Sequence, residues 1–364
     1  MGMNKRLDEI DTLRGLSALS VILIHVSGFY VAFSSIGFYS NQIVRFAVPI
    51  FILLSGFSLY YSDSTRKPDA YASFILKRLQ KIFMPYLLWS SVYLLLRILE
   101  GGKTHTLKEI GTILLHGQAS YHLYFIIIIM QLYLIYPLLR KAVQRFGRWT
   151  LVISFLITLY YQTGIYLRAV KLDILPIKRI LFENYMVLFT WVFFFVLGMM
   201  LAKHFDRFLA WADHKVIPAV LWVLSAALLI LDSRLTKTHE LSIRPSVMLY
   251  SVISFLFLYQ ICRWLKKHLP MIEKTLLWIS GQSFFIYFCH ALVLSRLIKY
   301  LQKGPLCFIF ARGAGMPVLF LLTTGLTCLL AYLLSFLPLS QYLGCRRSVR
   351  IKPTITPEAR AKAR

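Results

Sequence analysis

Charged residues are scarce in this chain, and acidic residues are the scarcest of them. Asp, Glu, Lys and Arg together make up 15% of the 364 residues, whereas soluble domains carry about 25%. Hydrophobic residues make up 58%, and the mean hydropathy is +0.65. This balance excludes an ordinary soluble domain and is typical of a protein embedded in a lipid bilayer.

Cysteines and the common catalytic signatures are also sparse or missing. The five cysteines are scattered and none belongs to a CxxC pair, so we expect no disulfide framework and no metal site. The chain lacks a Gly-rich phosphate loop, an HExxH zinc motif and a GxSxG turn. A serine hydrolase and a nucleotide-hydrolysing pump therefore have no support in the sequence.

No linker rich in Gly, Ser or Pro divides the chain, and we find no internal repeat of the kind common in transporters. We therefore predict one transmembrane domain over residues 1–344. A basic, Pro-containing tail over residues 345–364 follows, and its composition is typical of a disordered cytoplasmic segment.

Long apolar runs are what the chain has in abundance. A continuous run of about 20 apolar residues predicts a membrane-spanning helix, and the runs show no alternating pattern of a barrel. We therefore predict an all-α integral membrane protein, a bundle of about ten transmembrane helices. The predicted spans are residues 13–33, 43–61, 82–99, 121–139, 149–167, 185–202, 216–231, 246–262, 276–295 and 316–338.

Positive charge dominates what little charge there is. Lys and Arg number 41 against 15 Asp and Glu, for a formal charge of +26, which in a soluble protein would suggest nucleic acid. Loops on the side of the N-terminus carry roughly twice the Lys and Arg of the other side. We therefore predict cytoplasmic N- and C-termini, a multi-pass plasma-membrane location and no nucleic-acid partner. The first apolar run is too long for a cleaved signal peptide and lacks a cleavage site.

One stretch, RGLSALSVILIH, carries two ionisable residues on an otherwise apolar helix. Arg14 and His25 are eleven residues apart, which is about 16 Å of rise and close to three helical turns, so both project from one face. An ionisable group in mid-membrane must face protein or a water-filled cavity. An arginine at the membrane edge can hold an anion, and a histidine can take a proton from a hydroxyl. A long, thin donor such as a coenzyme A thioester would span the two.

Simpler roles are open for both residues. Arg14 can anchor the helix at the inner interface or pair with Asp11 one turn earlier. His25 can form a hydrogen bond to a neighbouring helix. Their shared face favours the functional interpretation.

Five stretches, in order over residues 8–300, resemble the membrane-bound acyltransferase-3 family. IDTLRGLSALSVILIH resembles the family's first helix, in which an Arg, ten residues and a His follow one another. The match continues in RFAVPIFILLSGFSLYYS, LKRLQKIFMPYLLW, YHLYFIIIIMQLYLIYPLL and ISGQSFFIYFCHALVL. Within the family, WVFFFVLGMMLAKHFDRFL and SFFIYFCH resemble the branch associated with intercellular-adhesion polysaccharides. Members of that branch are regarded either as exporters of poly-N-acetylglucosamine or as its O-acyltransferases.

The resemblance implies a bacterial membrane-bound O-acyltransferase. It would move an acetyl or succinyl group from cytoplasmic acyl-CoA, a substrate and not a permanent cofactor, to a hydroxyl of a cell-surface glycan or its lipid-linked precursor. The implied catalytic residues are His25, as base or acyl carrier, and Arg14, which orients the donor. The resemblance implies donor binding by Arg78 and Lys81, and acceptor binding by Arg45, His122, Tyr287 and His290. A polysaccharide synthase is a further candidate partner.

Alternatives stay open for each of these assignments. Arg78 and Lys81 can be ordinary loop charges, Arg45 can be an interfacial anchor, and Tyr287 with His290 can be a packed pair. At the level of function, the rivals are a polysaccharide exporter or flippase without covalent chemistry, and a receptor or scaffold for a synthase.

Overall fold

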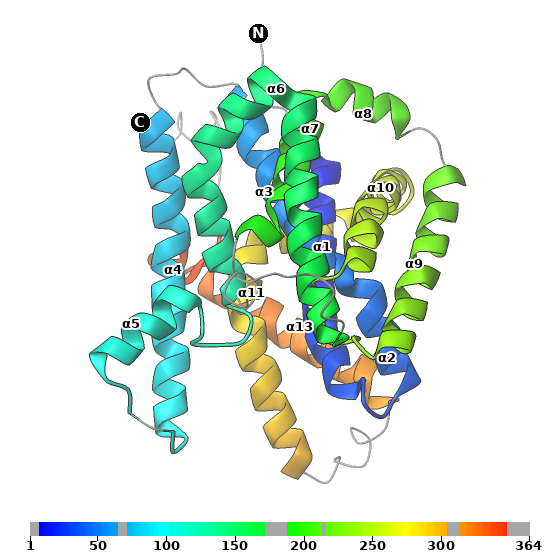
Figure 1. Ribbon diagram of the computed structural model, residues 1–364. Helices are drawn as coiled ribbons and strands as arrows, with labels where there is room; N and C mark the ends of the chain where they lie inside the picture. Colours follow the sequence, from blue (N-terminus) through cyan, green and yellow to red (C-terminus); the bar gives the residue numbers. More distant parts are fainter. Residues whose placement is uncertain are drawn as a thin grey trace, which may run out of the picture.

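The structure is a computed structural model that describes residues 7–64, 71–102, 104–171, 188–212, 216–303 and 313–347. Every regular element in these residues is a helix (Figure 1), so the predicted all-α class is confirmed. The α-helices are α1 (Asp8–Tyr30), α2 (Ser35–Ile43), α3 (Ala47–Ser64), α4 (Tyr71–Leu99), α5 (Leu107–His116), α6 (Tyr124–Ala169), α7 (Val192–Lys203), α8 (Phe205–Trp211), α9 (Val216–Thr236), α10 (Pro245–His268), α11 (Pro270–Lys303) and α13 (Gly315–Leu334). The short 3-10 helices are η1 (Val44–Phe46), η4 (Leu188–Thr190) and η5 (Ser340–Leu343).

Eight helical stretches among the described residues are long and apolar enough to cross a membrane. Two differences from the ten predicted spans have a physical reason. Helix α6 has 46 residues, about 69 Å of rise, which is more than twice the roughly 30 Å hydrocarbon core of a bilayer. It leaves helical geometry at Phe146, and Figure 1 shows two arms that meet at this bend. The arms correspond to the predicted spans 121–139 and 149–167.

The second difference concerns the predicted span 185–202. The described part of this run forms η4 and the apolar helix α7, which has only 12 residues. Residues 185–187 lie outside the described residues. This described helix is shorter than a membrane span, and it packs along α3 inside the bundle.

Glycines let the central helices approach closely. A Cβ added at Gly15 of α1 would collide with the backbone carbonyl of Leu276 in α11, and Gly56 and Gly198 play the same part between α3 and α7. Because lipid is as apolar as the helix surfaces, helices in a membrane associate through close van der Waals packing rather than through the hydrophobic effect. Small residues such as these glycines permit that close packing. The α1–α11 contact sets the Arg14–His25 face beside α11.

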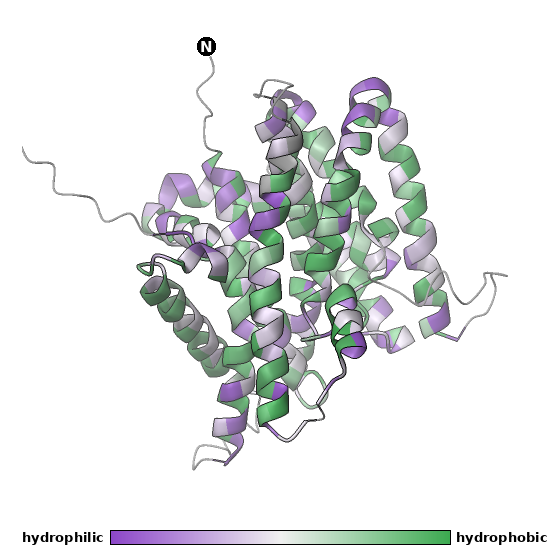
Figure 2. Cartoon of the chain, turned by 90° about the vertical axis from the view of Figure 1, so that its left-hand side faces the viewer, coloured by the Kyte–Doolittle hydropathy of each residue, from purple (hydrophilic) through white to green (hydrophobic). Residues whose placement is uncertain are grey.

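The bundle has two polar ends separated by an apolar middle. We call the end with the start of α1 the N-terminal face, and the end with the start of α2 the opposite face (Figure 1). Figure 2 shows hydrophobic residues along the long helices and hydrophilic residues gathered towards their ends. Helix α9 exposes Val220, Leu224 and Leu231, which suits contact with lipid chains. The cytoplasmic location of the termini stays a prediction, as does the disordered tail, of which residues 348–364 lie outside the described residues.

Candidate active site

Three histidines from distant parts of the chain meet in the interior of the bundle. His25 comes from α1, His290 from α11, and His122 from the segment 117–123 between α5 and α6. The rings of His25 and His290 are stacked with centroids 5.2 Å apart, and those of His122 and His290 are 5.1 Å apart, edge to face. His122 and His290 are buried and His25 is half-buried. We call His25, His122 and His290 the histidine cluster.

Two tyrosines hold the segment with His122 against its neighbours. The ring of Tyr287 lies 5.2 Å from that of His122, and its hydroxyl donates a hydrogen bond to the His122 carbonyl. Tyr93 of α4 packs 5.5 Å from the His122 ring and donates to the Phe288 carbonyl at 2.7 Å. Tyr287 and His290, whose ring centroids are 6.2 Å apart, therefore contact each other but do not form an isolated pair, because both face His122.

Each buried histidine has one ring nitrogen with a partner and one without. Nδ1 of His290 lies 3.0 Å from the Ile286 carbonyl, which only accepts, so Nδ1 carries the proton and Nε2 a lone pair. Nδ1 of His122 lies 3.1 Å from the Ser120 hydroxyl. Nε2 of both histidines is buried without a hydrogen-bond partner among the described residues. Such unpaired polar atoms cost free energy and mark places where a ligand can supply the missing partner.

Local sequence explains how His122 reaches this position. Helix α5 begins with a capping box between Thr106 and Glu109, and the Thr106 backbone N–H and hydroxyl hold the pKa of the Glu109 carboxyl below its usual value. It ends at Gly117, whose φ of 66° is left-handed and suits glycine. A Cβ there would collide with the backbone of Tyr124. The chain therefore turns sharply enough for His122 to enter the bundle.

A cavity of about 250 Å³ runs beside this cluster towards the N-terminal face. Arg14, Arg78 and Lys81 line it, and so does Tyr287, which lies one turn from His290 on α11. A second cavity of about 470 Å³ adjoins it, since Arg14 and Arg78 also line that one. The structure thus brings Arg14, one of the two predicted catalytic residues, together with both predicted donor-binding residues, and Tyr287 connects this cavity to the histidine cluster. We call the two cavities the donor cavity.

Arg14 pairs with Asp11 and also lines the donor cavity. Its guanidinium donates to Asp11 at 2.5 Å and to the Ser58 hydroxyl at 2.6 Å, so the expected pairing with Asp11 exists. The side chain of Arg14 is nevertheless 25% exposed and lines both parts of the donor cavity. A guanidinium has five N–H donors, so these two contacts leave donors for an anion.

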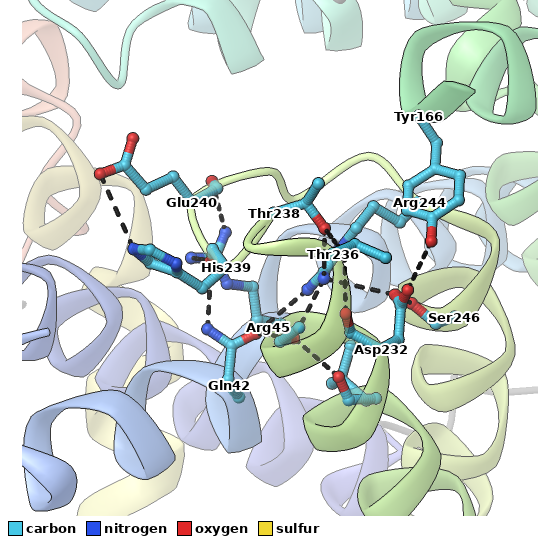
Figure 3. Close-up of polar contacts among 12 residues, drawn as sticks. Gln42, Arg45, Tyr166, Asp232, Thr236, Thr238, His239, Glu240, Arg244 and Ser246 are labelled. Atoms are coloured by element: carbon cyan, nitrogen blue, oxygen red, sulfur yellow. Dashed lines mark hydrogen bonds and ion pairs between the residues drawn. The ribbon is translucent and has the colours of Figure 1, made fainter. Parts of the chain in front are cut away.

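Arg45 of η1 lies towards the opposite face and is buried among protein groups. It is only 5% exposed and, like His25, His122 and His290, it lines neither part of the donor cavity. Its guanidinium donates to the carbonyls of His239 and Glu240, the latter at 2.8 Å (Figure 3). It also donates to the Ser242 hydroxyl at 2.6 Å and to the side-chain oxygen of Asn41. Arg45 therefore holds the loop before α10 against α2.

Two residues near the cluster escaped the sequence analysis. Tyr121 is 58% exposed, yet its ring lies 4.9 Å from that of His25 and 5.4 Å from that of His122. Its only signal in the sequence is that it precedes His122. Asn41 donates to the carbonyl of Ile24, immediately before His25, at 2.8 Å, and no motif announces this contact. Asn41 thus links Arg45 to the turn of α1 that carries His25.

Comparisons with known proteins agree with this architecture. The family model of an acyltransferase domain, acyltransferase-3, matches residues 7–336. YfiQ of Bacillus subtilis, which carries the name membrane-bound acyltransferase, is 29% identical over 303 residues, or 79% of this chain and 80% of its own length. A protein of Staphylococcus aureus strain N315, named as a poly-β-1,6-N-acetyl-D-glucosamine export protein, is 29% identical over 272 residues, 72% of this chain and 73% of its own. Its counterpart in Staphylococcus epidermidis is 27% identical over 268 residues, 72% of each chain. No solved structure matches the chain.

Proposed function

Because this chain belongs to the acyltransferase-3 family of membrane proteins, we propose that it transfers an acyl group from acyl-CoA to a hydroxyl of a surface polysaccharide. One observation carries the proposal: the donor cavity has cations at the N-terminal face and leads to Tyr287, beside the histidine cluster. A cation-lined entrance joined to a group of proton acceptors is what a phosphate-bearing, activated donor requires.

The donor would bind with its charged end at the N-terminal face. Arg14, Arg78 and Lys81 offer three cations, which suits the several phosphates of coenzyme A. Beyond them the cavity is lined by apolar side chains, among them Phe51 and Phe125, which suit a thin, weakly polar arm. The thioester would then lie beside the histidine cluster.

His25 would perform the proton transfer. In its neutral form it accepts the proton of the acceptor hydroxyl while the hydroxyl oxygen attacks the thioester carbonyl. The tetrahedral intermediate collapses, the carbon–sulfur bond breaks, and the departing thiolate takes the proton from His25. Atoms and charge balance, and the products are an ester and coenzyme A. A variant of this scheme places the acyl group on His25 for part of the cycle.

The acceptor would approach from the side of Tyr121. This ring is exposed and touches His25, so a sugar packed against it would bring a hydroxyl to the base. The unpaired Nε2 of His290 would accept a hydrogen bond from a neighbouring hydroxyl, and the unpaired Nε2 of His122 would accept or donate one according to its tautomer. The names of the staphylococcal relatives support a polymer of N-acetylglucosamine as the acceptor.

The same names support a second candidate function, export of such a polymer without covalent chemistry. One experiment separates the two. Cells that express wild type, His25→Ala or Arg14→Ala at equal membrane levels are fed labelled acetate, and surface polymer and base-labile ester label are both quantified. Acyl transfer predicts that polymer persists while ester label is lost from both variants. Less external polymer with unchanged label per unit of polymer would contradict acyl transfer and favour export.

A further inference from the structure

A separate cavity of about 440 Å³ lies along the last three turns of α10, on the N-terminal face. None of its lining residues belongs to the donor cavity. It is bounded by the end of α8 at Ala212 and, on α10, by Phe257, Gln260, Ile261, Arg263, Trp264, Lys267 and His268. We call it the α10 cavity.

The α10 cavity changes polarity along its length. Phe257 and Ile261 form the part nearest the middle of the helix, while Lys267 and His268 lie at its end. Trp264 lies between them, 51% exposed, with its ring 5.3 Å from that of His268. Tryptophan prefers the level of the lipid headgroups, with an apolar body and a polar edge. The cavity therefore has an apolar floor in the membrane and a basic mouth at the headgroup level.

Three cations lie within little more than one turn near the end of α10. Lys266 faces α1 and forms ion pairs with Asp8 at 3.4 Å and Glu9 at 3.0 Å. Arg263 and Lys267 line the α10 cavity. Their positive charges would attract an anion to the mouth of this cavity.

We propose that the α10 cavity binds an anionic phospholipid, with the headgroup phosphate at Arg263 and Lys267 and an acyl chain along Phe257 and Ile261. A soluble phosphate would use only the basic mouth, whereas a lipid uses both parts. Anionic headgroups are attracted to basic side chains at the membrane surface. The inference does not depend on the acyl-transfer proposal.

A bound lipid would stabilise a junction that supports the donor cavity. Gln260 donates to the Ala212 carbonyl at 3.2 Å and so ties α8 to α10 at the cavity wall. Lys266 ties the same stretch of α10 to the start of α1, two turns before Arg14. We therefore expect bound anionic lipid to raise the melting temperature of the purified protein.

The test is native mass spectrometry of the purified full-length chain in detergent with phosphatidylglycerol, phosphatidylcholine or inorganic phosphate. The variant is Arg263→Gln/Lys267→Gln. The matched control, Lys141→Gln/Arg148→Gln, removes the same charge from exposed positions around the bend of α6 on the same face. Thermal melts in neutral lipid check that all three proteins are folded.

We expect wild type and control to retain phosphatidylglycerol over phosphatidylcholine by about tenfold or more, and the Arg263/Lys267 variant to lose that preference. Anionic lipid should raise the melting temperature of wild type and control only. Equal loss in the control and the variant would show a general charge effect and overturn the site. Unchanged retention in the variant, or inorganic phosphate that displaces the lipid, would also overturn it.

Discussion

Arginines stand at both ends of the bundle, and the two ends use them in opposite ways. On the N-terminal face, the Arg14 side chain is 25% exposed and shares a cavity wall with Arg78 and Lys81. On the opposite face, Arg45 and Arg244 are 5% and 0% exposed, and protein groups accept their hydrogen bonds (Figure 3). An arginine that lines a cavity can bind a ligand, whereas a buried one with protein partners holds backbone in place.

The opposite-face network is built around a single carboxylate. Asp232 of α9 forms an ion pair with Arg244 at 3.3 Å and accepts from the Tyr166 hydroxyl at 2.6 Å. Gln42 of α2 joins the network by accepting from Arg244 at 3.0 Å. The pKa of Arg244 is lowered because burial disfavours its charged form, and Asp232 opposes that shift. The network therefore joins α2, α6, α9 and the start of α10.

The largest effect on activity should come from a substitution in the histidine cluster, which is separate from the arginines of both faces. His25→Ala should lower acyl transfer by a factor on the order of 10²–10⁴, because the proposed base is lost. The measurement is ester label per unit of polymer at equal protein level. His116→Ala, at an exposed helix end, is the matched control and should retain activity. Full activity of His25→Ala would refute the proposed base.

On the opposite face, Arg45→Gln should act on stability. The change leaves Asn41 and backbone carbonyls without their donor, at a cost of roughly 2–4 kcal/mol in the free energy of unfolding. A thermal melt in detergent measures the loss, and Arg234→Gln, an exposed arginine on the same face, should melt close to wild type. A normal melting temperature with a raised KM for donor would place Arg45 with the ligand-binding arginines instead.

On the N-terminal face, Arg14→Ala should act on donor binding. Losing one charge-assisted contact to phosphate should raise the donor KM by about ten- to a hundredfold while the melting temperature changes little. Arg14→Lys should recover part of the affinity, and Arg148→Ala serves as a control for charge on this face. The assay is coenzyme A release by the purified protein. An unchanged KM together with a lower melting temperature would show that Arg14 only packs against Asp11 and Ser58.

The smallest effect should be at Tyr121. Tyr121→Leu removes the exposed ring beside His25, and we expect about three- to tenfold less ester label per unit of polymer. Tyr121→Phe should keep most of the activity if the ring face matters. Coenzyme A release without acceptor should stay normal, since the donor cavity is untouched. Tyr300→Leu is the control, because Tyr300 is an exposed tyrosine on α11. Equal losses in Tyr121→Leu and Tyr300→Leu would indicate a general role of interfacial tyrosines.

Much of the fold was readable because lipid imposes simple rules. An apolar run must form a helix to satisfy its backbone, so the runs became the long helices. The rule does not predict when two apolar runs continue into one another as a single helix. We recognised no sequence signal for α6, in which the two runs are joined by a bend at Phe146. Nor does the rule fix the length of the helix that a run forms, since the described part of the run 185–202 contains an α-helix of only 12 residues, α7.

The candidate site was partly readable for a similar reason. Arg14 and His25 share a face because helical geometry depends only on their spacing. Arg45 shows the limit of such reasoning. The resemblance implied acceptor binding, which stays a prediction, whereas its contacts with His239, Glu240 and Ser242 show that it also holds backbone in place. Those partners are about 195 residues away in the chain, at a separation no local pattern reports.

By itself, the sequence determined that the chain is helical and membrane-embedded, and that Arg14 and His25 lie on one helix face. These properties follow from composition and local geometry. Only the tertiary structure decided that His122 and His290 join His25, that Arg78 and Lys81 share a cavity with Arg14, and that Arg45 does not. The reason is that such encounters depend on close packing, as where Gly15 lets α1 approach α11. Such packing joins residues that are far apart in the sequence, so no local pattern predicts it.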